Sequence, residues 1–332
     1  MKFSLIICTY MRPKSLLTLL ESVVVQSNYP SEILVIDGSL NDDTEKILDA
    51  NKFEGLKYFK VSKENRGLTK QRNFGIEKVA DNIDIVCFLD DDIILTPTYF
   101  ETLLSTYQLH PEALGVGGYI ANEVAWRPLK PSEKPNSNQF AYDGYVRSEG
   151  ARFALRKKLG LDADRPPAFM PDFAHGRSVS FLPPSGKIYE VEQFMGGVSS
   201  FKTEVLHTEK FSEYFVGYGL YEDADFTLRL SKIGKLYVNT AAQLFHYHEP
   251  SGRPNQYSYG KMVVRNGWYV WRVKHPIPSF KARLKWNATA LLLTLIRFSN
   301  SIKGVQKKEA FTEAIGRTIG WFSILVKRPK FK

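Results

Sequence analysis

Two hydrophobic periodicities alternate along the first 120 residues of the chain. Short apolar or alternating runs of strand type lie at 3–9, 32–37, 56–62 and 83–90. Apolar residues at helical spacing occupy the segments between them, at 13–27, 41–50 and 68–80. Strands that alternate with helices predict parallel β-α-β units, whose hydrophobic strands are buried between helices. The sequence therefore predicts an α/β fold with a mostly parallel central sheet.

The pattern changes after residue 120. Prolines are scattered among aromatic and charged residues from 121 to 190, which favours an irregular insertion such as a lid or an acceptor-facing segment. A strand, a glycine turn and a helix start are predicted again between 188 and 206. A further helix is predicted from residue 222, because Phe226, Leu230 and Ile233 follow helical spacing and Gly234 can end it.

The charge is unevenly distributed along the 332 residues. Residues 250–332 contain 17 Lys and Arg against only Glu309 and Glu313, a net charge of +15. The other 28 basic and 33 acidic residues give the first 249 residues a net charge of −5. Such a basic region suggests an anionic partner, either a membrane or a nucleic acid.

The two ends of the chain and the two cysteines bear on its location. Cys8 and Cys87 both lie in apolar strand-like runs, which indicates buried free thiols in a reducing compartment. The N-terminus enters a strand-like run at once and has no signal-peptide pattern, so we expect a cytoplasmic protein. The longest apolar run near the C-terminus, Ala288 to Ile296, is much shorter than the roughly 20 residues that span a bilayer. The Trp, Leu, Phe, Lys and Arg residues of segment 261–332 suit either the surface of an anionic membrane or packing on the rest of the protein.

Three consecutive carboxylates, Asp90, Asp91 and Asp92, follow the apolar run that ends at Leu89. Because side chains alternate along an extended strand, Asp90 and Asp92 share one face and Asp91 points to the other. Two carboxylates on one side can bind a hard divalent cation such as Mg²⁺ or Mn²⁺. The alternative is that these acids only begin the next helix.

A second acidic site is the sequence "GYGLYEDAD", which places Glu222 and Asp223 in the first turn of the predicted helix. On one interpretation the acids complement the helix dipole, and Asp225 pairs with Arg229. On the other, the glycine-aromatic loop holds a carboxylate at a cleft, where it acts as a general base. The residues alone leave both interpretations open.

Two histidines, His246 and His248, lie two residues apart at the end of a strand-like run, which puts both rings on one face. Imidazole suits Mn²⁺ or Zn²⁺, so a metal or phosphate role for at least one of them competes with a structural role. The sequence has no CxxC or HExxH zinc motif and no glycine-rich phosphate loop.

The order of these motifs resembles the family 2 glycosyltransferases, which have a GT-A fold. The resemblance lies between residues 4 and 230 and rests on these segments: "SLIICTYMRPKSLLTLLESV", "EILVIDGSLNDDT", "NRGLTKQRNFGI", "FLDDDI", "GGVSSFKTEVL" and "GYGLYEDADFTLRL". It implies a Rossmann-like catalytic domain over 1–250. Within it, 1–120 would bind the nucleotide-sugar, 121–190 would be the insertion, and 191–250 would serve acceptor and base. Residues 251–332 would form a helical basic region.

The resemblance also implies roles for individual residues on the donor side. The nucleoside-diphosphate sugar would be bound by Thr9, Tyr10, Arg12 and Asp37, with Asp37 accepting from the base, and Arg72 would brace the donor. The sequence reads "IDGS" where many members read "DDGS", which leaves recognition of uridine less defined than the metal site.

The same resemblance implies which residues bind the metal and which residue is the base. Asp90 and Asp92 match the DXD motif and would hold Mn²⁺ or Mg²⁺, with Asp92 the direct ligand, while Asp91 would lie near the ribose or the sugar. The metal site would be completed by His246, or by His248 instead. Asp223 would be the catalytic base, with Glu222 beside it orienting acceptor or donor.

The implied activity is inverting transfer of a sugar, from a UDP-sugar in the first place, to a hydroxyl of a glycan or lipid-linked acceptor. Such a reaction belongs to cell-surface polysaccharide biosynthesis, and the enzyme would be peripheral on the inner face of the membrane. A sugar-phosphate nucleotidyltransferase is the alternative enzyme class, although it would not need the acid pair at 222–223. A non-catalytic nucleic-acid-binding protein is a third reading, but the basic region has no recognised binding motif, so we expect no nucleic-acid partner. The sequence does not indicate an oligomeric state.

Overall fold

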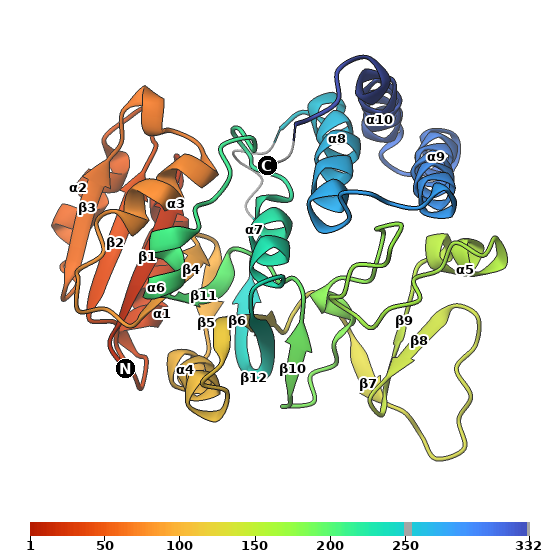
Figure 1. Ribbon diagram of the computed structural model, residues 1–332. Helices are drawn as coiled ribbons and strands as arrows, with labels where there is room; N and C mark the ends of the chain where they lie inside the picture. The colour runs from red at the N-terminus through yellow and green to blue at the C-terminus, as the bar shows by residue number, and fades with distance from the viewer. Residues whose placement is uncertain (249–253, 331–332) are drawn as a thin grey trace. The chain divides into compact units, whose positions relative to one another are not determined.

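A computed structural model describes residues 1–248 and 254–330 (Figure 1). The chain divides into two units, one formed by Met1–Val124 with Leu182–Gly252 and the other by Ala125–Phe181 with Arg253–Lys332. The domain boundary predicted between residues 250 and 251 lies outside the described residues. Segment 125–181 groups with the C-terminal helices, which no pattern in the sequence indicated.

The first unit is built on one large sheet. Its strands are β1 (Phe3–Thr9), β2 (Glu32–Asp37), β3 (Leu56–Lys60), β4 (Ile85–Asp90), β5 (Ile93–Leu95), β6 (Ala113–Ile120), β10 (Ile188–Val191), β11 (Val198–Lys202) and β12 (Lys235–His246). The strand order is β10-β12-β6-β11-β4-β1-β2-β3, and β5 pairs with β12. In the described part of this sheet, all strands except β5, β10 and β11 run in one direction. The predicted α/β fold with a mostly parallel sheet is therefore confirmed.

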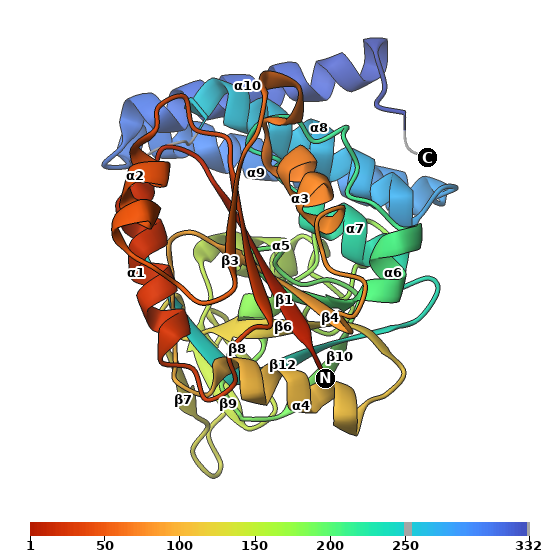
Figure 2. The ribbon, with the colours of Figure 1, turned by 90° about the vertical axis from the view of Figure 1, so that its left-hand side faces the viewer.

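Helices cover both faces of this sheet (Figure 2). They are α1 (Pro13–Val24), α2 (Asp43–Ala50), α3 (Leu68–Ile76), α4 (Tyr99–Leu109), α6 (Thr203–Thr208) and α7 (Glu222–Leu230), with a 3-10 turn at Lys63–Asn65. On one face, alternate strand residues such as Leu5 and Val35 are fully buried against α1 and α4. On the other face, Gly75 lets α3 approach the sheet, because a β-carbon there would lie 2.9 Å from Ile6.

Parallel strands bring their carboxyl ends to one edge of the sheet. In this unit β1 ends at Thr9, β2 at Asp37, β4 at Asp90 and β12 at His246. The reversed strand β11 begins at the same edge, since it pairs with β4 in antiparallel register. The predicted polar clusters therefore lie along one edge of the sheet.

Two sequence-based expectations in this unit were wrong in detail. The helix at 68–80 ends at Ile76, and the helix that begins at Glu222 ends at Leu230 rather than at Gly234. The backbone N–H groups of Ile233 and Gly234 both donate to the carbonyl of Leu230, which closes the helix in a turn. Ile233 therefore leaves the buried face of the helix and is 65% exposed.

The second unit contains regular structure where the proline content predicted an irregular insertion. A three-stranded antiparallel sheet is formed by β7 (Trp126–Pro128), β9 (Tyr145–Ser148) and β8 (Gln139–Tyr142) in that order, followed by α5 (Ala151–Lys158) and a 3-10 turn at Val179–Phe181. The hairpin between β8 and β9 turns at Asp143 and Gly144, both with positive φ. These strands are only three or four residues long, which hides their periodicity.

Three helices complete the second unit, as predicted for the basic C-terminal region: α8 (Gln256–Lys274), α9 (Phe280–Lys303) and α10 (Lys307–Val326). Helices α8 and α10 touch backbone to backbone, because Gly260 and Gly316 each leave room for the other helix's carbonyl groups. The buried carboxylate of Glu313 in α10 binds Arg297 of α9 at 2.6 Å. In the part of the chain that the structure describes, no helix is long and apolar enough to cross a membrane.

Candidate active site

Each of the three acids at the end of β4 has a cationic partner within the protein. Arg72 lies 3.5 Å from Asp90, and Arg12 lies 3.0 Å from Asp91. Asp92 is 3.1 Å from Nε2 of His246 and 3.5 Å from Arg12. Protein cations therefore relieve the mutual repulsion of these three carboxylates before any ligand binds.

The predicted alternation of these acids is what the structure shows. Oxygen atoms of Asp90 and Asp92 and a ring nitrogen of His246 all lie within 4.8 Å of one another. Asp91 instead accepts hydrogen bonds from Thr9 Oγ1 at 2.6 Å and from Arg12. Burial raises the pKa of Asp91 to about 6, although both donors act to lower it.

The donor atoms of Asp90, Asp92 and His246 fit a divalent cation. Two carboxylates and one imidazole suit Mn²⁺, and the carboxylates alone suit Mg²⁺. Burial lowers the pKa of His246, but its hydrogen bonds to Asp92 and Glu123 outweigh burial and raise that pKa to about 10. Of the two histidines left open by the sequence, His246 is the one grouped with Asp90 and Asp92.

Arg72 links the two acidic motifs, which are 130 residues apart in the chain. Arg72 is 2% exposed, and its guanidinium pairs with Glu222 at the start of α7 as well as with Asp90. It also lies over the rings of Phe88 and Phe211, at 5.8 and 5.2 Å. The buried position of Arg72 fixes both carboxylates relative to β4.

The glycine pair before β11 makes room for this arrangement. A β-carbon at Gly197 would overlap the carboxylate of Asp90, and one at Gly196 would meet the side chains of Arg72 and Glu222. The carbonyl of Gly197 also accepts from the N–H of Asp90 at 3.0 Å. Residues with a side chain therefore cannot occupy these two positions without moving the acids.

The two acids at the start of α7 have different surroundings. Glu222 is buried, and burial raises its pKa to about 8 against the lowering effect of Arg72. Asp223 is half-buried, and its oxygens accept from the backbone N–H of Gly196 at 3.2 Å and of Ala224 at 2.8 Å. Burial also raises the pKa of Asp223. A partly exposed carboxylate with a raised pKa can act as a general base.

The purely structural role considered for the acids of this helix, an ion pair along the helix, belongs to Asp225. Asp225 is fully buried and pairs with Arg229 at 3.0 Å, as the helical spacing suggested. The loop before the helix has positive φ at Gly217, Gly219 and Tyr221. This tight loop places Glu222 and Asp223 beside Gly196, whereas Asp225 pairs with Arg229.

The loops after β1 and β2 are tied together by short hydrogen bonds. Asp37 is fully buried, and its two oxygens accept from the backbone N–H of Ser39 at 2.7 Å and from the hydroxyl of Tyr58 at 2.9 Å. Ser39 Oγ in turn accepts from the N–H of Met11 at 2.7 Å. Asp37 therefore supports these loops from within, whereas Tyr10 is 39% exposed.

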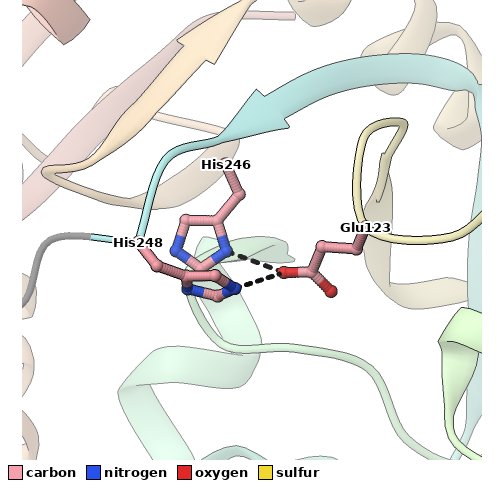
Figure 3. Close-up of side chains that lie close together, drawn as sticks. All are labelled: Glu123, His246 and His248. Atoms are coloured by element: carbon pink, nitrogen blue, oxygen red, sulfur yellow. Dashed lines mark hydrogen bonds and ion pairs between the residues drawn. The ribbon is translucent and has the colours of Figure 1, made fainter.

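One residue of the site was missed by the sequence analysis. Glu123 follows β6 at the same edge, and its Oε1 lies 3.0 Å from Nδ1 of His246 and 3.3 Å from Nε2 of His248 (Figure 3). The signal was available, because a carboxylate just after a strand that runs parallel to β12 falls beside the end of β12. The proline-rich segment that begins there concealed it.

Comparison with known proteins identifies a family and two similar proteins. The family model described as "Glycosyl transferase family 2" matches residues 4–170. The chain is 31% identical over 137 residues to the glucosyl-dolichyl phosphate glucuronosyltransferase of Haloferax volcanii, covering 41% of this chain and 42% of that protein. It is 36% identical over 126 residues to an uncharacterized glycosyltransferase of Haemophilus influenzae, covering 36% of this chain and 46% of the other. The chain thus matches less than half the length of these relatives.

A similar arrangement is present in a solved structure. The crystal structure of GalNAc-T7 with UDP, GalNAc and Mn²⁺ matches with a TM-score of 0.50 at 15% sequence identity, covering 83% of this chain and 50% of that chain. At this identity the likeness concerns the fold alone.

Proposed function

Because the chain belongs to glycosyl transferase family 2 and has its GT-A fold, we propose that it is an inverting glycosyltransferase. The donor is a nucleoside-diphosphate sugar, with a UDP-sugar as the first choice, and the acceptor is a hydroxyl of a glycan or lipid-linked glycan. The observation that supports this proposal is that Arg72 pairs with both Asp90 and Glu222, so that the acids at the end of β4 and those at the start of α7 lie close together.

The donor half of the proposal uses the residues at the ends of β1, β2 and β4. Asp90, Asp92 and His246 hold the cation, Mn²⁺ or Mg²⁺, which when bound stabilises negative charge on the departing diphosphate. Tyr10 contacts the nucleoside from the exposed side of the pocket, while Thr9, Arg12 and Asp37 support it through the hydrogen bonds described above. Asp91, held by Thr9 and Arg12, faces the ribose or sugar.

The acceptor half uses the start of α7. Displacement at the anomeric carbon with inversion needs a base for the attacking hydroxyl, on the side opposite to the leaving group. Asp223 takes that proton, because its carboxylate is partly exposed and, within the described part of the chain, accepts only from backbone N–H groups. Glu222 is committed to Arg72 and orients the site rather than accepting the proton.

The lipid-linked class of acceptor is supported by the relative from Haloferax volcanii, whose name describes action on a dolichyl phosphate compound. Such acceptors are intermediates of cell-surface glycan assembly, so we place the reaction in polysaccharide biosynthesis at the inner face of the membrane.

A panel of nucleoside-diphosphate sugars tests the activity. We expect one donor to raise the melting temperature in the presence of Mn²⁺ and to be hydrolysed slowly without acceptor, since water can replace the hydroxyl. Release of the free sugar and nucleoside diphosphate identifies a glycosyltransferase. When pyrophosphate is added, formation of a nucleoside triphosphate together with a sugar 1-phosphate would indicate a nucleotidyltransferase instead.

A face of α9 supports attachment to an anionic membrane. Phe280, Leu284, Leu291 and Leu295 are between 54% and 76% exposed and are spaced by four, seven and four residues, which puts them on one side of the helix. Lys281 lies in the same first turn, and the region from 250 onward has a net charge of +15. Exposed apolar side chains with surrounding cations suit the interface of an anionic bilayer.

Sedimentation with vesicles tests this attachment. The variant L291D/L295D should lose binding to vesicles that contain phosphatidylglycerol, while the wild type should bind them and not neutral vesicles. Ile233→Asp, at a 65% exposed apolar residue of the other unit, is the matched control and should bind normally. Equal binding by the wild type and L291D/L295D would show that this face does not attach the protein to the membrane.

A further inference from the structure

Two imidazoles and one carboxylate converge beside the site described above. Nδ1 of His246 lies 3.0 Å from Oε1 of Glu123, and Nε2 of His248 lies 3.3 Å from the same oxygen (Figure 3). One ligand atom from each of these residues lies within 4.8 Å of the other two. His248 is turned toward Glu123, whereas only His246 also belongs to the group with Asp90 and Asp92.

The side chain of Asn122 holds the segment with Glu123 against the segment with the two histidines. Oδ1 of Asn122 accepts from the N–H of His246, and Nδ2 of Asn122 donates to the carbonyl of His246, both at 2.9 Å. This pair of bonds fixes the residue before Glu123 against the end of β12. The rings of His246 and His248 have their centroids 4.1 Å apart, so both imidazoles are presented together.

The spacing fits a tetrahedral metal ion. Zinc binds nitrogen and oxygen at about 2.1 Å, so its ligand atoms lie roughly 3.4 Å apart in a tetrahedron. The observed separations of 3.0 and 3.3 Å need only small adjustments. Two histidines and one glutamate also form a known type of zinc site with three protein ligands, which leaves a fourth position for water.

We propose that Glu123, His246 and His248 form a second metal site, which takes zinc or a similar transition metal and competes with the Asp90 and Asp92 site for His246. The competition rests on the proposed function of the first site, whereas the binding of zinc does not. The two sites differ in chemistry, because nitrogen donors favour zinc and carboxylates favour Mn²⁺ or Mg²⁺.

The competition follows from the two nitrogens of one ring. A neutral imidazole has one lone pair for a metal and carries its proton on the other nitrogen. When Nδ1 of His246 binds zinc beside Glu123, the proton is on Nε2, which donates to Asp92 Oδ1, 3.1 Å away. Nε2 then cannot bind a metal in the first site, so zinc in the second site weakens binding of Mn²⁺ in the first.

Zinc titration of the metal-free full-length protein tests the site. In competition with a chromophoric chelator, we expect the wild type to bind one Zn²⁺ and His248→Ala and Glu123→Gln to bind it at least tenfold more weakly. His110→Ala is the matched control, because His110 lies 3.4 Å from Glu112 but has no second histidine in that pair. Its zinc affinity should equal that of the wild type. Circular dichroism and melting temperature show that the variants are folded.

Mn²⁺ titrations then separate this inference from the proposed function. We expect zinc to lower the Mn²⁺ affinity of the wild type at least tenfold and to have little effect on that of His248→Ala. Equal zinc affinity in wild type, His248→Ala and Glu123→Gln would overturn the second site, and Glu123 would then only orient His246. Zinc binding that leaves the Mn²⁺ affinity unchanged would overturn the competition. A failure of every sugar donor would count against the proposed function, while the zinc result would stand.

Discussion

The acids at residues 90–92 and those at 222–225 are compensated in different ways. In the first group, Asp90, Asp91 and Asp92 each face an arginine or histidine. In the second, Glu222 faces Arg72 and Asp225 faces Arg229, but Asp223 makes no ion pair among the described residues and accepts only backbone hydrogen bonds.

This difference separates carboxylates that make a fixed ionic contact from the carboxylate that can exchange a proton. A cationic partner lowers the pKa of a carboxylate and occupies its oxygens, which suits a fixed contact or a metal site. A carboxylate that is partly buried without a cation has a raised pKa and accepts a proton more readily. The comparison therefore singles out Asp223, which the sequence alone could not distinguish from its neighbours.

Replacing Asp223 should have the largest effect on transfer. Asp223→Asn removes the base and keeps the shape, so we expect kcat to fall by about 10²- to 10⁴-fold, the contribution usual for general base catalysis. Donor and Mn²⁺ binding, measured by calorimetry, should change less than twofold. Asp225→Asn is the control on the same helix and should keep its kcat per folded molecule. Near-normal turnover in Asp223→Asn would remove the distinction between the two groups.

Breaking the link between the groups should have the next largest effect. Arg72→Met leaves Glu222 buried without its cation, which should lower the free energy of unfolding by about 3–5 kcal/mol. Lys235→Met removes an exposed partner of Glu190 and should change the free energy of unfolding very little, because solvent screens exposed ion pairs. Urea denaturation measures both values. If Arg72→Met and Lys235→Met lower the free energy of unfolding by similar small amounts, Arg72 does not join the two motifs.

Much of this site could be predicted from the sequence, because it follows from local rules. Continuous apolar strands separated by helices predict parallel pairing, and parallel pairing brings Thr9, Asp37 and Asp90 to one edge. The alternation of Asp90 and Asp92 follows from the strand itself. These inferences needed only the spacing of neighbouring residues.

The partners of these residues could not be predicted, because they depend on contacts between distant segments. Nothing near Arg72 in the sequence points to Glu222, and the insertion of β11 between β4 and β6 is visible only in the pairing. Strand β5, three residues long, is too short to show a period. Ile233 fitted the helical spacing, yet the closing turn at Leu230 excludes it from the buried face.

The raised pKa of Glu222 predicts how stability depends on pH. Because the folded state binds this proton more tightly than the unfolded state, the stabilisation is complete below about pH 4.5 and is lost as the pH rises to about 8. The difference in unfolding free energy between wild type and Glu222→Gln should therefore fall with pH, by at most about 1.4 kcal/mol per unit. Urea denaturation at several pH values measures it. A difference that rises with pH would show that Arg72 outweighs burial.

The smallest expected effect concerns the hydroxyl that binds Asp91. Thr9→Val removes the 2.6 Å hydrogen bond and leaves the contact with Arg12, so we expect a loss of about 1 kcal/mol in unfolding free energy. The pKa of Asp91 should also rise, because this hydrogen bond lowers it. Urea denaturation and an NMR titration measure the two changes. Thr18→Val, which removes an exposed bond to Lys14, is the control and should do neither. If the two variants behave alike, hydrogen bonding does not help hold the charge of Asp91, and Arg12 alone distinguishes this acid from Asp223.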